Sequence, residues 1–242
     1  MRERTAAATR SATPRGFFTV DVALFTPLGQ QLGVLAIPSD RPRARDAVSI
    51  PWDTARAGES LVDTAHRLLR THSGTVPMWV EQVGAFADGT RHPSGAALSV
   101  CFAAVVPGGV VRQEALGAAA TQAGGAAPAT WLDAESVARL ADRQRQMVQA
   151  AQQAIRRRMD YEPIPFRLLP PHFTLSELQH IYEVLLGRRL HKASFRRALH
   201  ASWLVEPTDH WRSEGRGRPA QLFRYAPRRR RGHRRGVRFD LL

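Results

Sequence analysis

The sequence is poor in cysteine and has no long apolar run. Its one cysteine, Cys101, cannot form a disulfide within the chain, and it lies in an apolar segment where cysteines are usually inert packing. A run of about 18 apolar residues, which a membrane-spanning helix needs, is missing. The first sixteen residues contain no apolar stretch of the kind found in secretory signals. These absences predict a protein of the reducing cytoplasm, with neither a membrane span nor a nucleophilic cysteine.

Charge is unevenly distributed along the 242 residues, which are enough for two modest domains. Residues 1–160 carry 18 arginines and 14 acids, a net charge of +4. Residues 161–242 carry 17 lysines and arginines against 7 acids, a net charge of +10. A basic surplus confined to one part of a chain predicts a polyanionic partner for that part, with DNA ahead of an acidic membrane surface.

The N-terminal half has the pattern of a mixed α/β domain. Residues 1–16 are small, polar and basic, which is typical of a disordered arm. One helix is expected from about Ser60 to Thr71, and residues 107–128 are rich in Gly and Ala and fit either a loop or a weak strand pair. Four strands are expected, at Phe17–Phe25, Leu32–Ile37, Met78–Phe86 and Ala96–Val106. We therefore expect an α/β/α sandwich with a mixed sheet over residues 17–132.

A long polar segment follows, rich in Arg, Gln and Ala. It predicts a helix from Asp133 to Met159, with Asp133 as its cap, inside a linking segment of residues 133–160. Because the segment has few large apolar residues, we expect this helix to bridge domains or subunits rather than to fill a core.

Residues 161–227 have the pattern of a winged helix-turn-helix domain. Two prolines in YEPIPF end the preceding helix, and a capping box from Thr174 to Glu177 opens the next one, which stops at Gly187. A second helix begins near Lys192 and is expected to place Phe195, Leu199 and Trp203 on its apolar face. Two strands, Trp203–Glu206 and Gln221–Tyr225, flank a basic hairpin tip. The arginine-rich tail, residues 228–242, is expected to be disordered and to attract DNA without sequence preference.

In a winged helix the second helix enters the major groove, and the preceding turn and the hairpin contact the DNA backbone or the minor groove. Arginine is suited to bidentate contact with guanine, whereas lysine mainly meets phosphate. The alternative interpretation is that these basic residues form a charged surface that is only solvated and contacts no DNA. The residues expected to contact DNA are Arg188, Arg189 and His191 in the turn, Lys192, Ser194, Arg196, Arg197 and His200 on the second helix, and Arg216 and Arg218 on the hairpin.

The segment WDTARAGESLVDTAHRLLRTHSG, residues 52–74, resembles a Nudix box, the magnesium site of pyrophosphohydrolases. Asp53 stands where the box has its first glycine, and Leu68, Thr71 and His72 stand where it has its metal-binding glutamates. Magnesium needs hard oxygen ligands, so this loss predicts a domain without a metal and without catalytic residues. A nucleotide fragment is still expected to bind, and the candidate residues are Arg56, Glu59, Arg67 and Arg70, although Arg67 is as well placed to brace the box loop.

Together these segments resemble the Nudix-related transcriptional regulators, the NrtR-like family, over about residues 17–226. The matching blocks are GESL, residues 58–61; EQVGAFAD, residues 81–88; YEPIPFRLLPPHFTLSELQHIYEVLLGR, residues 161–188; and GRGRPAQLFRY, residues 215–225. The resemblance implies a homodimeric, cytoplasmic and nucleoid-associated repressor. Its Nudix-like domain would sense ADP-ribose or a related nucleotide, and its winged helix would bind an inverted-repeat operator near genes of NAD metabolism.

Two other functions remain open at this point. The first is a residual pyrophosphohydrolase that recruits a metal through Glu59, Glu81 and Asp88. The second is a packaging protein that binds nucleic acid through the arginine-rich tail, without sequence preference.

Overall fold

A computed structural model describes residues 17–43, 46–108, 129–133, 136–213 and 219–227. The expected N-terminal arm, most of the Gly/Ala-rich segment, the hairpin tip with Arg216 and Arg218, and the arginine-rich tail lie outside these residues. Within them, no helix combines the length and the apolar character that crossing a bilayer requires.

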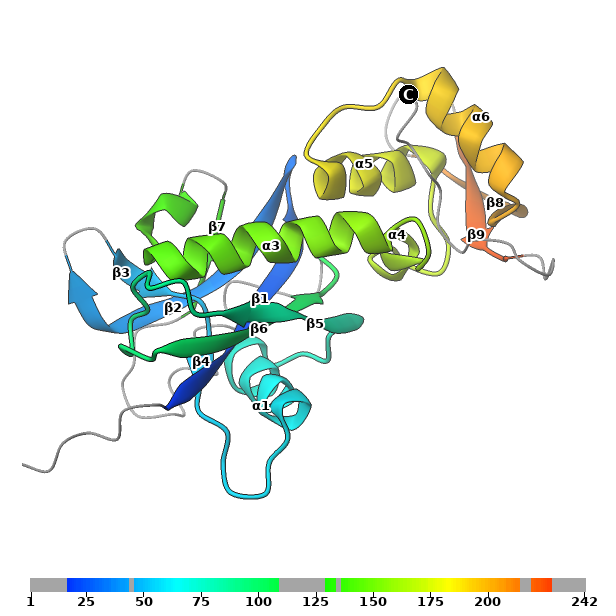
Figure 1. The fold of residues 1–242 in the computed structure, drawn as a ribbon. Coiled ribbons are helices and arrows are strands. Elements are labelled where there is room, and N and C mark those ends of the chain that lie inside the picture. The colour runs from blue at the N-terminus through cyan, green and yellow to red at the C-terminus, as the bar shows by residue number, and fades with distance from the viewer. Residues whose placement is uncertain (1–16, 44–45, 109–128, 134–135, 214–218, 228–242) are drawn as a thin grey trace, which may run out of the picture.

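One mixed sheet organises the N-terminal domain (Figure 1). Its strands follow the order β3-β2-β1-β6-β5, with β4 paired to β1 and β7 paired to β2. β1 and β6 run parallel and the remaining pairs are antiparallel. The strands are β1 (Phe18–Leu28), β2 (Gln31–Arg43), β3 (Asp46–Ser49), β4 (Trp52–Asp53), β5 (Trp79–Phe86), β6 (Leu98–Val105) and β7 (Thr130–Leu132). The four expected strands are confirmed, and β3, β4 and β7 were not anticipated.

Helix α1 (Leu61–Ser73) covers one face of the sheet (Figure 1). Successive residues of a strand face opposite sides, so alternate residues of β1 and β6 point towards α1. Ser60 caps the helix through a capping box with Asp63, and Gly74 ends it in a left-handed conformation. The apolar cluster on this face contains Val20, Val22 and Leu24 of β1, Val100, Phe102 and Ala104 of β6, and Ala65, Leu68 and Leu69 of α1.

Helix α3 (Asp142–Arg158) covers the opposite face (Figure 1). Its residues Met147, Val148, Ala151 and Ile155 are almost fully buried against the sheet. The expectation that this helix would not fill a core is therefore wrong, although the helix does bridge the two domains through its contact with α5. Alanines on the buried side let the helix approach the sheet closely. Because alanine is small, the sequence of the helix looks polar although one face is apolar.

The expected start of this helix at Asp133 is also wrong. A short 3-10 helix, η1 (Ser136–Arg139), precedes α3, and the chain is extended at Ala141 before α3 begins. Asp133 does act as a cap, but for the short helix, since its Oδ1 accepts a hydrogen bond of 2.8 Å from the Ser136 amide.

The C-terminal domain is a winged helix. Thr174 and Glu177 form the expected capping box at the start of α5. Trp203, expected on the apolar face of α6 and in a strand, instead caps α6 in a left-handed conformation with φ of 54° and is 51% exposed. The elements are α4 (Ile164–Arg167), α5 (Leu175–Leu186), α6 (Lys192–Ser202), β8 (Val205–Arg212) and β9 (Ala220–Tyr225).

A continuous apolar core joins the two domains. It runs from the α3 face of the sheet through Met159 and Phe166 to Tyr182 and Phe195 of the helix-turn-helix. Phe166, in α4, stacks on Tyr225 of β9 with a ring separation of 4.5 Å. The expected fold class, an α/β/α sandwich with a mixed sheet followed by a winged helix, is confirmed.

Gly187 connects the end of α5 to this interdomain contact. It adopts a left-handed φ of 69°, and a Cβ added there would lie 2.9 Å from Nη2 of Arg156, which belongs to α3. Arg156 Nε donates a hydrogen bond of 3.1 Å to the carbonyl oxygen of Leu185. Arg156 thus binds an otherwise unpaired carbonyl at the end of α5, where a cation also interacts favourably with the helix dipole.

A pair of alanine substitutions separates this contact from ordinary backbone strain. Gly74 has a similar φ of 63°, but nothing lies within 4 Å of its added Cβ. We expect Gly74→Ala to lower the free energy of unfolding by about 1 kcal/mol through strain alone. Gly187→Ala also moves the end of the Arg156 side chain and weakens its hydrogen bond to Leu185, and we expect it to lower this free energy by about 0.5–1 kcal/mol more. Urea unfolding of the two variants measures the difference, and equal losses would show that Arg156 contributes nothing here.

Candidate functional site

The outer face of α6 is basic and exposed. Lys192, Arg196, Arg197 and His200 are all exposed, while Phe195 and Leu199 are fully buried on the opposite side of the helix. His191 is exposed at the N-cap position, and Ser194 is half-buried, with its hydroxyl 3.5 Å from Nδ1 of His191. Buried apolar residues at helical spacing fix the orientation of α6, so the basic side chains face solvent.

The turn between α5 and α6 extends this basic surface. Arg188 and Arg189 are exposed, and Arg189 Nη1 lies 3.1 Å from Oε2 of Glu183. Burial would raise the pKa of Glu183, but hydrogen bonds from the Leu190 amide, Gln179 and Arg189 outweigh burial and lower it. Glu183 is therefore ionised at neutral pH and holds the turn against the end of α5.

The strand that leads into the wing is tied to the start of α5. Arg212 Nη1 of β8 lies 2.6 Å from Oε1 of Glu177, the residue that completes the capping box. One carboxylate thus closes the helix and holds the base of the wing. The wing residues expected to contact DNA, Arg216 and Arg218, lie outside the described residues.

In the box segment, Arg67 of α1 holds the loop that precedes its own helix. Its Nε and Nη2 donate to the two carboxylate oxygens of Glu59 at 2.8 and 2.9 Å, and its Nη1 lies 2.6 Å from Oδ2 of Asp53. The hydrogen bond from Arg67 and one from the Arg56 amide lower the pKa of Glu59 to about 2. Two of the four predicted ligand-binding residues therefore bind each other, whereas Arg56 and Arg70 are exposed.

The positions that would carry metal ligands do not fit magnesium. Leu68 is buried in the apolar cluster beneath α1, and Thr71 is exposed. Burial lowers the pKa of His72, against the opposing influence of Asp53, so this imidazole is neutral. One neutral imidazole without a carboxylate ligand is a poor site for a hard dication.

The acids of the alternative hydrolase hypothesis are engaged elsewhere. Glu81 accepts two hydrogen bonds from Arg158, at 2.5 and 2.8 Å, and Asp88 accepts one of 2.6 Å from the Thr90 hydroxyl. In the described part of the chain, no three His, Cys, Asp or Glu residues are grouped so that they could hold a metal ion. Glu59, Glu81 and Asp88 therefore do not form the metal site that this hypothesis requires.

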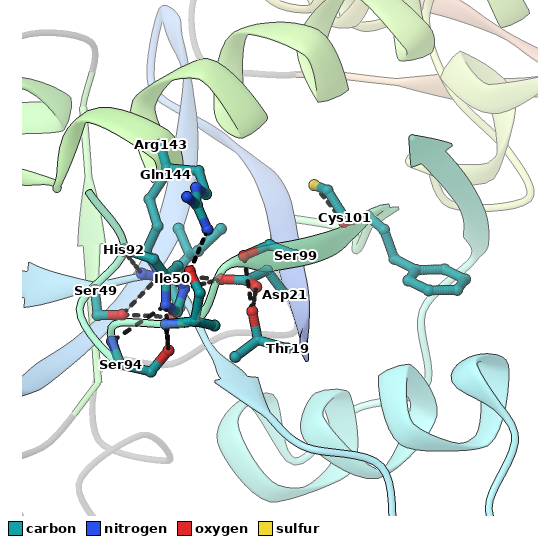
Figure 2. Close-up of polar contacts among 12 residues, drawn as sticks. Thr19, Asp21, Ser49, Ile50, His92, Ser94, Ser99, Cys101, Arg143 and Gln144 are labelled. Carbon is teal, nitrogen blue, oxygen red and sulfur yellow. Dashed lines mark hydrogen bonds and ion pairs between the residues drawn. The ribbon is translucent and has the colours of Figure 1, made fainter. Parts of the chain in front are cut away.

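A buried polar network that the sequence analysis did not predict lies on the α3 face of the sheet (Figure 2). Asp21 of β1 is fully buried and accepts hydrogen bonds from Thr19 at 2.7 Å, His92 Nε2 at 2.8 Å and Gln144 Nε2 at 3.1 Å. Gln144, in α3, also donates to the Ser49 hydroxyl at 2.9 Å and accepts from the Ile50 amide at 3.2 Å. The one sequence feature that could have indicated such a network is Asp21, the single acid in the sequence of β1.

His92 lies between Ser94 and Asp21. The Ser94 amide donates a hydrogen bond of 3.1 Å to His92 Nδ1, and the Ser94 hydroxyl lies 2.6 Å from the same nitrogen. His92 Nε2 faces the buried Asp21 carboxylate, which Thr19 and Gln144 also contact. The network joins β1, the loop before β6 and α3 into one rigid unit, so it is a structural feature of this domain.

Comparisons with known proteins place these two domains in one family. The family described as "NrtR DNA-binding winged helix domain" matches residues 165–225. A relative from Acinetobacter baylyi, described as "ADPR responsive transcriptional repressor NtrR", is 30% identical over 221 residues, which are 90% of this chain and 85% of the relative. This chain belongs to the NrtR family of transcriptional regulators.

Solved structures agree with this membership. A crystal structure of Shewanella oneidensis NrtR complexed with a 27mer DNA has 31% sequence identity and a TM-score of 0.69, covering 87% of this chain and 94% of that one. A MutT/nudix family protein from Enterococcus faecalis has 18% identity and a TM-score of 0.60, covering 90% and 89%, which shows the shared fold alone. The N-terminal domain of this NrtR family member is thus Nudix-like, and its box lacks the metal ligands.

Proposed function

We propose that this protein is a homodimeric transcriptional repressor that binds an inverted-repeat operator through α6 of each winged helix. The observation that carries the proposal is the exposed basic face of α6, which a buried apolar face holds outward in a fully formed helix-turn-helix. A helix presented in this way enters the major groove, where arginine recognises guanine and lysine meets phosphate. Genes of NAD metabolism are the expected targets.

We further propose that the Nudix-like domain binds ADP-ribose or a related nucleotide without hydrolysing it. The support is the braced box loop, in which Glu59 and Arg67 are tied together, and the loss of the magnesium ligands at Leu68, Thr71 and His72. The exposed Arg56 and Arg70 remain available to a diphosphate.

The proposed regulation follows from the position of α3. This helix lies on the sheet of the Nudix-like domain and contacts α5 of the winged helix. A nucleotide that binds one arrangement of the two domains more tightly would shift the protein towards that arrangement. The spacing of the two recognition helices in the dimer would then no longer match the half-sites.

Fluorescence anisotropy with labelled DNA from upstream of the protein's own gene tests the regulatory proposal. We expect sequence-dependent binding, and ADP-ribose is expected to change the affinity by about fivefold or more, a typical size for allosteric coupling. A scrambled duplex of the same length and composition is the control. Equal affinities for the two duplexes would contradict operator recognition and support binding by the basic tail alone.

The absence of hydrolysis is a separate expected result. Incubation with ADP-ribose and magnesium or manganese should release no AMP above the protein-free blank, because the box supplies no carboxylate triad. AMP release that disappears in Glu59→Gln would instead establish a residual pyrophosphohydrolase.

A further inference from the structure

A cavity of about 410 Å³ lies between the Nudix-like domain and the helix-turn-helix. Three parts of the chain line it: the turn between β1 and β2, one side of α3, and the end of α5 with the turn that follows. The lining residues are Gln30, Gln31, Leu32, Gln152, Arg156, Glu183, Val184, Gly187, Arg188 and Arg189. Its volume falls within the roughly 300–1,000 Å³ of small-molecule sites, and domain interfaces are a usual place for such sites.

The lining of this cavity is polar and carries a positive charge. Three arginines and one glutamate give it a net charge of +2. The glutamate, Glu183, is already satisfied by the Leu190 amide at 2.9 Å, Gln179 at 3.0 Å and Arg189 at 3.1 Å. Glu183 thus offsets the charge of Arg189, and Arg156 and Arg188 leave the lining positive, which favours an anion.

Arg156 connects the cavity to the helix-turn-helix. Its Nε holds the Leu185 carbonyl at the end of α5, and its guanidinium lies against Gly187. Arg188 and Arg189, on the other side of the cavity, belong to the turn that leads directly into α6. A ligand in this cavity would therefore touch both the Nudix-like domain and the turn that leads into α6.

We propose that this cavity is a second ligand site, distinct from the box loop, for a phosphate group on a small anion of pyrophosphate size. A ligand in the cavity engages Arg188 and Arg189 and removes them from contact with the DNA backbone. This second part of the inference rests on the proposed DNA-binding function. The same phosphate chemistry can come from two sources, a free anion or the DNA backbone itself, and the experiment distinguishes them.

Two variants on neighbouring positions of α3 test the site in the full-length protein. Gln152 lines the cavity, whereas Gln153 is exposed and does not line it. Both Gln152→Glu and Gln153→Glu add one negative charge to the same helix, so non-specific attraction of anions to the basic chain changes equally. Inorganic pyrophosphate binding is measured by isothermal titration calorimetry at an ionic strength fixed with sodium chloride, after melting curves confirm that both variants fold.

The expected result is a pyrophosphate affinity about tenfold weaker in Gln152→Glu than in Gln153→Glu, because a carboxylate inside the cavity repels the anion at close range. Comparing the DNA affinities of the two variants without pyrophosphate shows whether the phosphate comes from a free anion or from the DNA backbone. Equal DNA affinities indicate a free anion, and added pyrophosphate should then weaken DNA binding only in Gln153→Glu. Weaker DNA binding by Gln152→Glu indicates that the DNA backbone supplies the phosphate.

Equal pyrophosphate affinities in the two variants would overturn the second site, whatever their DNA affinities. The calorimetric measurement involves no DNA, so its result stays valid even if the anisotropy experiment finds no operator recognition. Conversely, the loss of this site would not affect the assignment of α6 as the recognition helix.

Discussion

Replacing both Arg196 and Arg197 by alanine is expected to weaken operator binding by roughly 100-fold or more, since a base contact by one arginine contributes about 1–3 kcal/mol. Both side chains are exposed on α6, and the residues that hold α6 in place, Phe195 and Leu199, are unchanged. The variant should therefore fold normally. Fluorescence anisotropy at a fixed salt concentration measures the loss, because salt alone changes such affinities strongly.

A second double variant controls for net charge. Arg139, in η1, and Arg157, on α3, are also exposed, and replacing both by alanine removes the same charge outside the winged helix. We expect this variant to keep operator affinity within about threefold of the native protein, because charges beyond a Debye length of about 10 Å are largely screened. Equal losses in the two double variants would show that charge in general, and not α6, determines binding.

The winged helix could be predicted because its signals are local. The capping box of Thr174 and Glu177 and the left-handed Gly187 define both ends of α5 within fourteen residues. Such signals act through hydrogen bonds to the backbone near each helix end, so a short stretch of sequence is enough to reveal them. The exposed basic residues of α6 then followed from helical spacing alone.

Helix α3 was misjudged because its packing depends on distant residues. Its buried face is made partly of Ala151 and Ala154, which carry little hydrophobic signal but fit closely against a sheet. The helical conformation is interrupted between Arg139 and Asp142, where the sequence contains no glycine or proline that would predict the interruption. The position of Trp203 was predicted wrongly for a different reason. Residues other than glycine rarely adopt the left-handed conformation, so the sequence does not suggest that Trp203 caps α6.

The box loop was predicted in part. The missing glutamates predict a box without magnesium, and the brace by Arg67 that the sequence allows is present in the structure. What the sequence could not indicate is that Asp53, in place of the box glycine, joins this brace through an ion pair of 2.6 Å. The guanidinium of Arg67 thus binds the carboxylates of both Asp53 and Glu59 and holds the substituted loop.

The buried network could not be predicted from the sequence because its residues are far apart along the chain. His92 lies 71 residues from Asp21, and Gln144 lies 123 residues from it. Nothing local distinguishes Gln144 from the other glutamines of a polar helix. Only the packing of α3 on the sheet brings its amide group to the buried carboxylate, so this part of the fold has to be seen in three dimensions.

The second large expected effect concerns this network. Gln144→Ala should lower the free energy of unfolding by roughly 3 kcal/mol, because buried groups that lose a hydrogen-bonding partner keep their full desolvation cost. Gln144 makes contacts with Asp21, Ser49 and Ile50, all in the interior, and its removal leaves the Ile50 amide without that acceptor. In a chain of this size such a loss corresponds to a fall in Tm of about 6–12 °C.

Gln149→Ala is the matched control, since Gln149 lies on the same helix and is exposed. We expect its Tm to stay within about 1 °C of the native value, because surface substitutions rarely change stability by more than about 0.5 kcal/mol. A Tm for Gln144→Ala that matches the control would mean that water replaces the amide in the network. In that case the hydrogen bonds of Gln144 would not be what fixes α3 on the sheet, and the apolar contacts of Met147, Val148 and Ile155 would have to hold it alone.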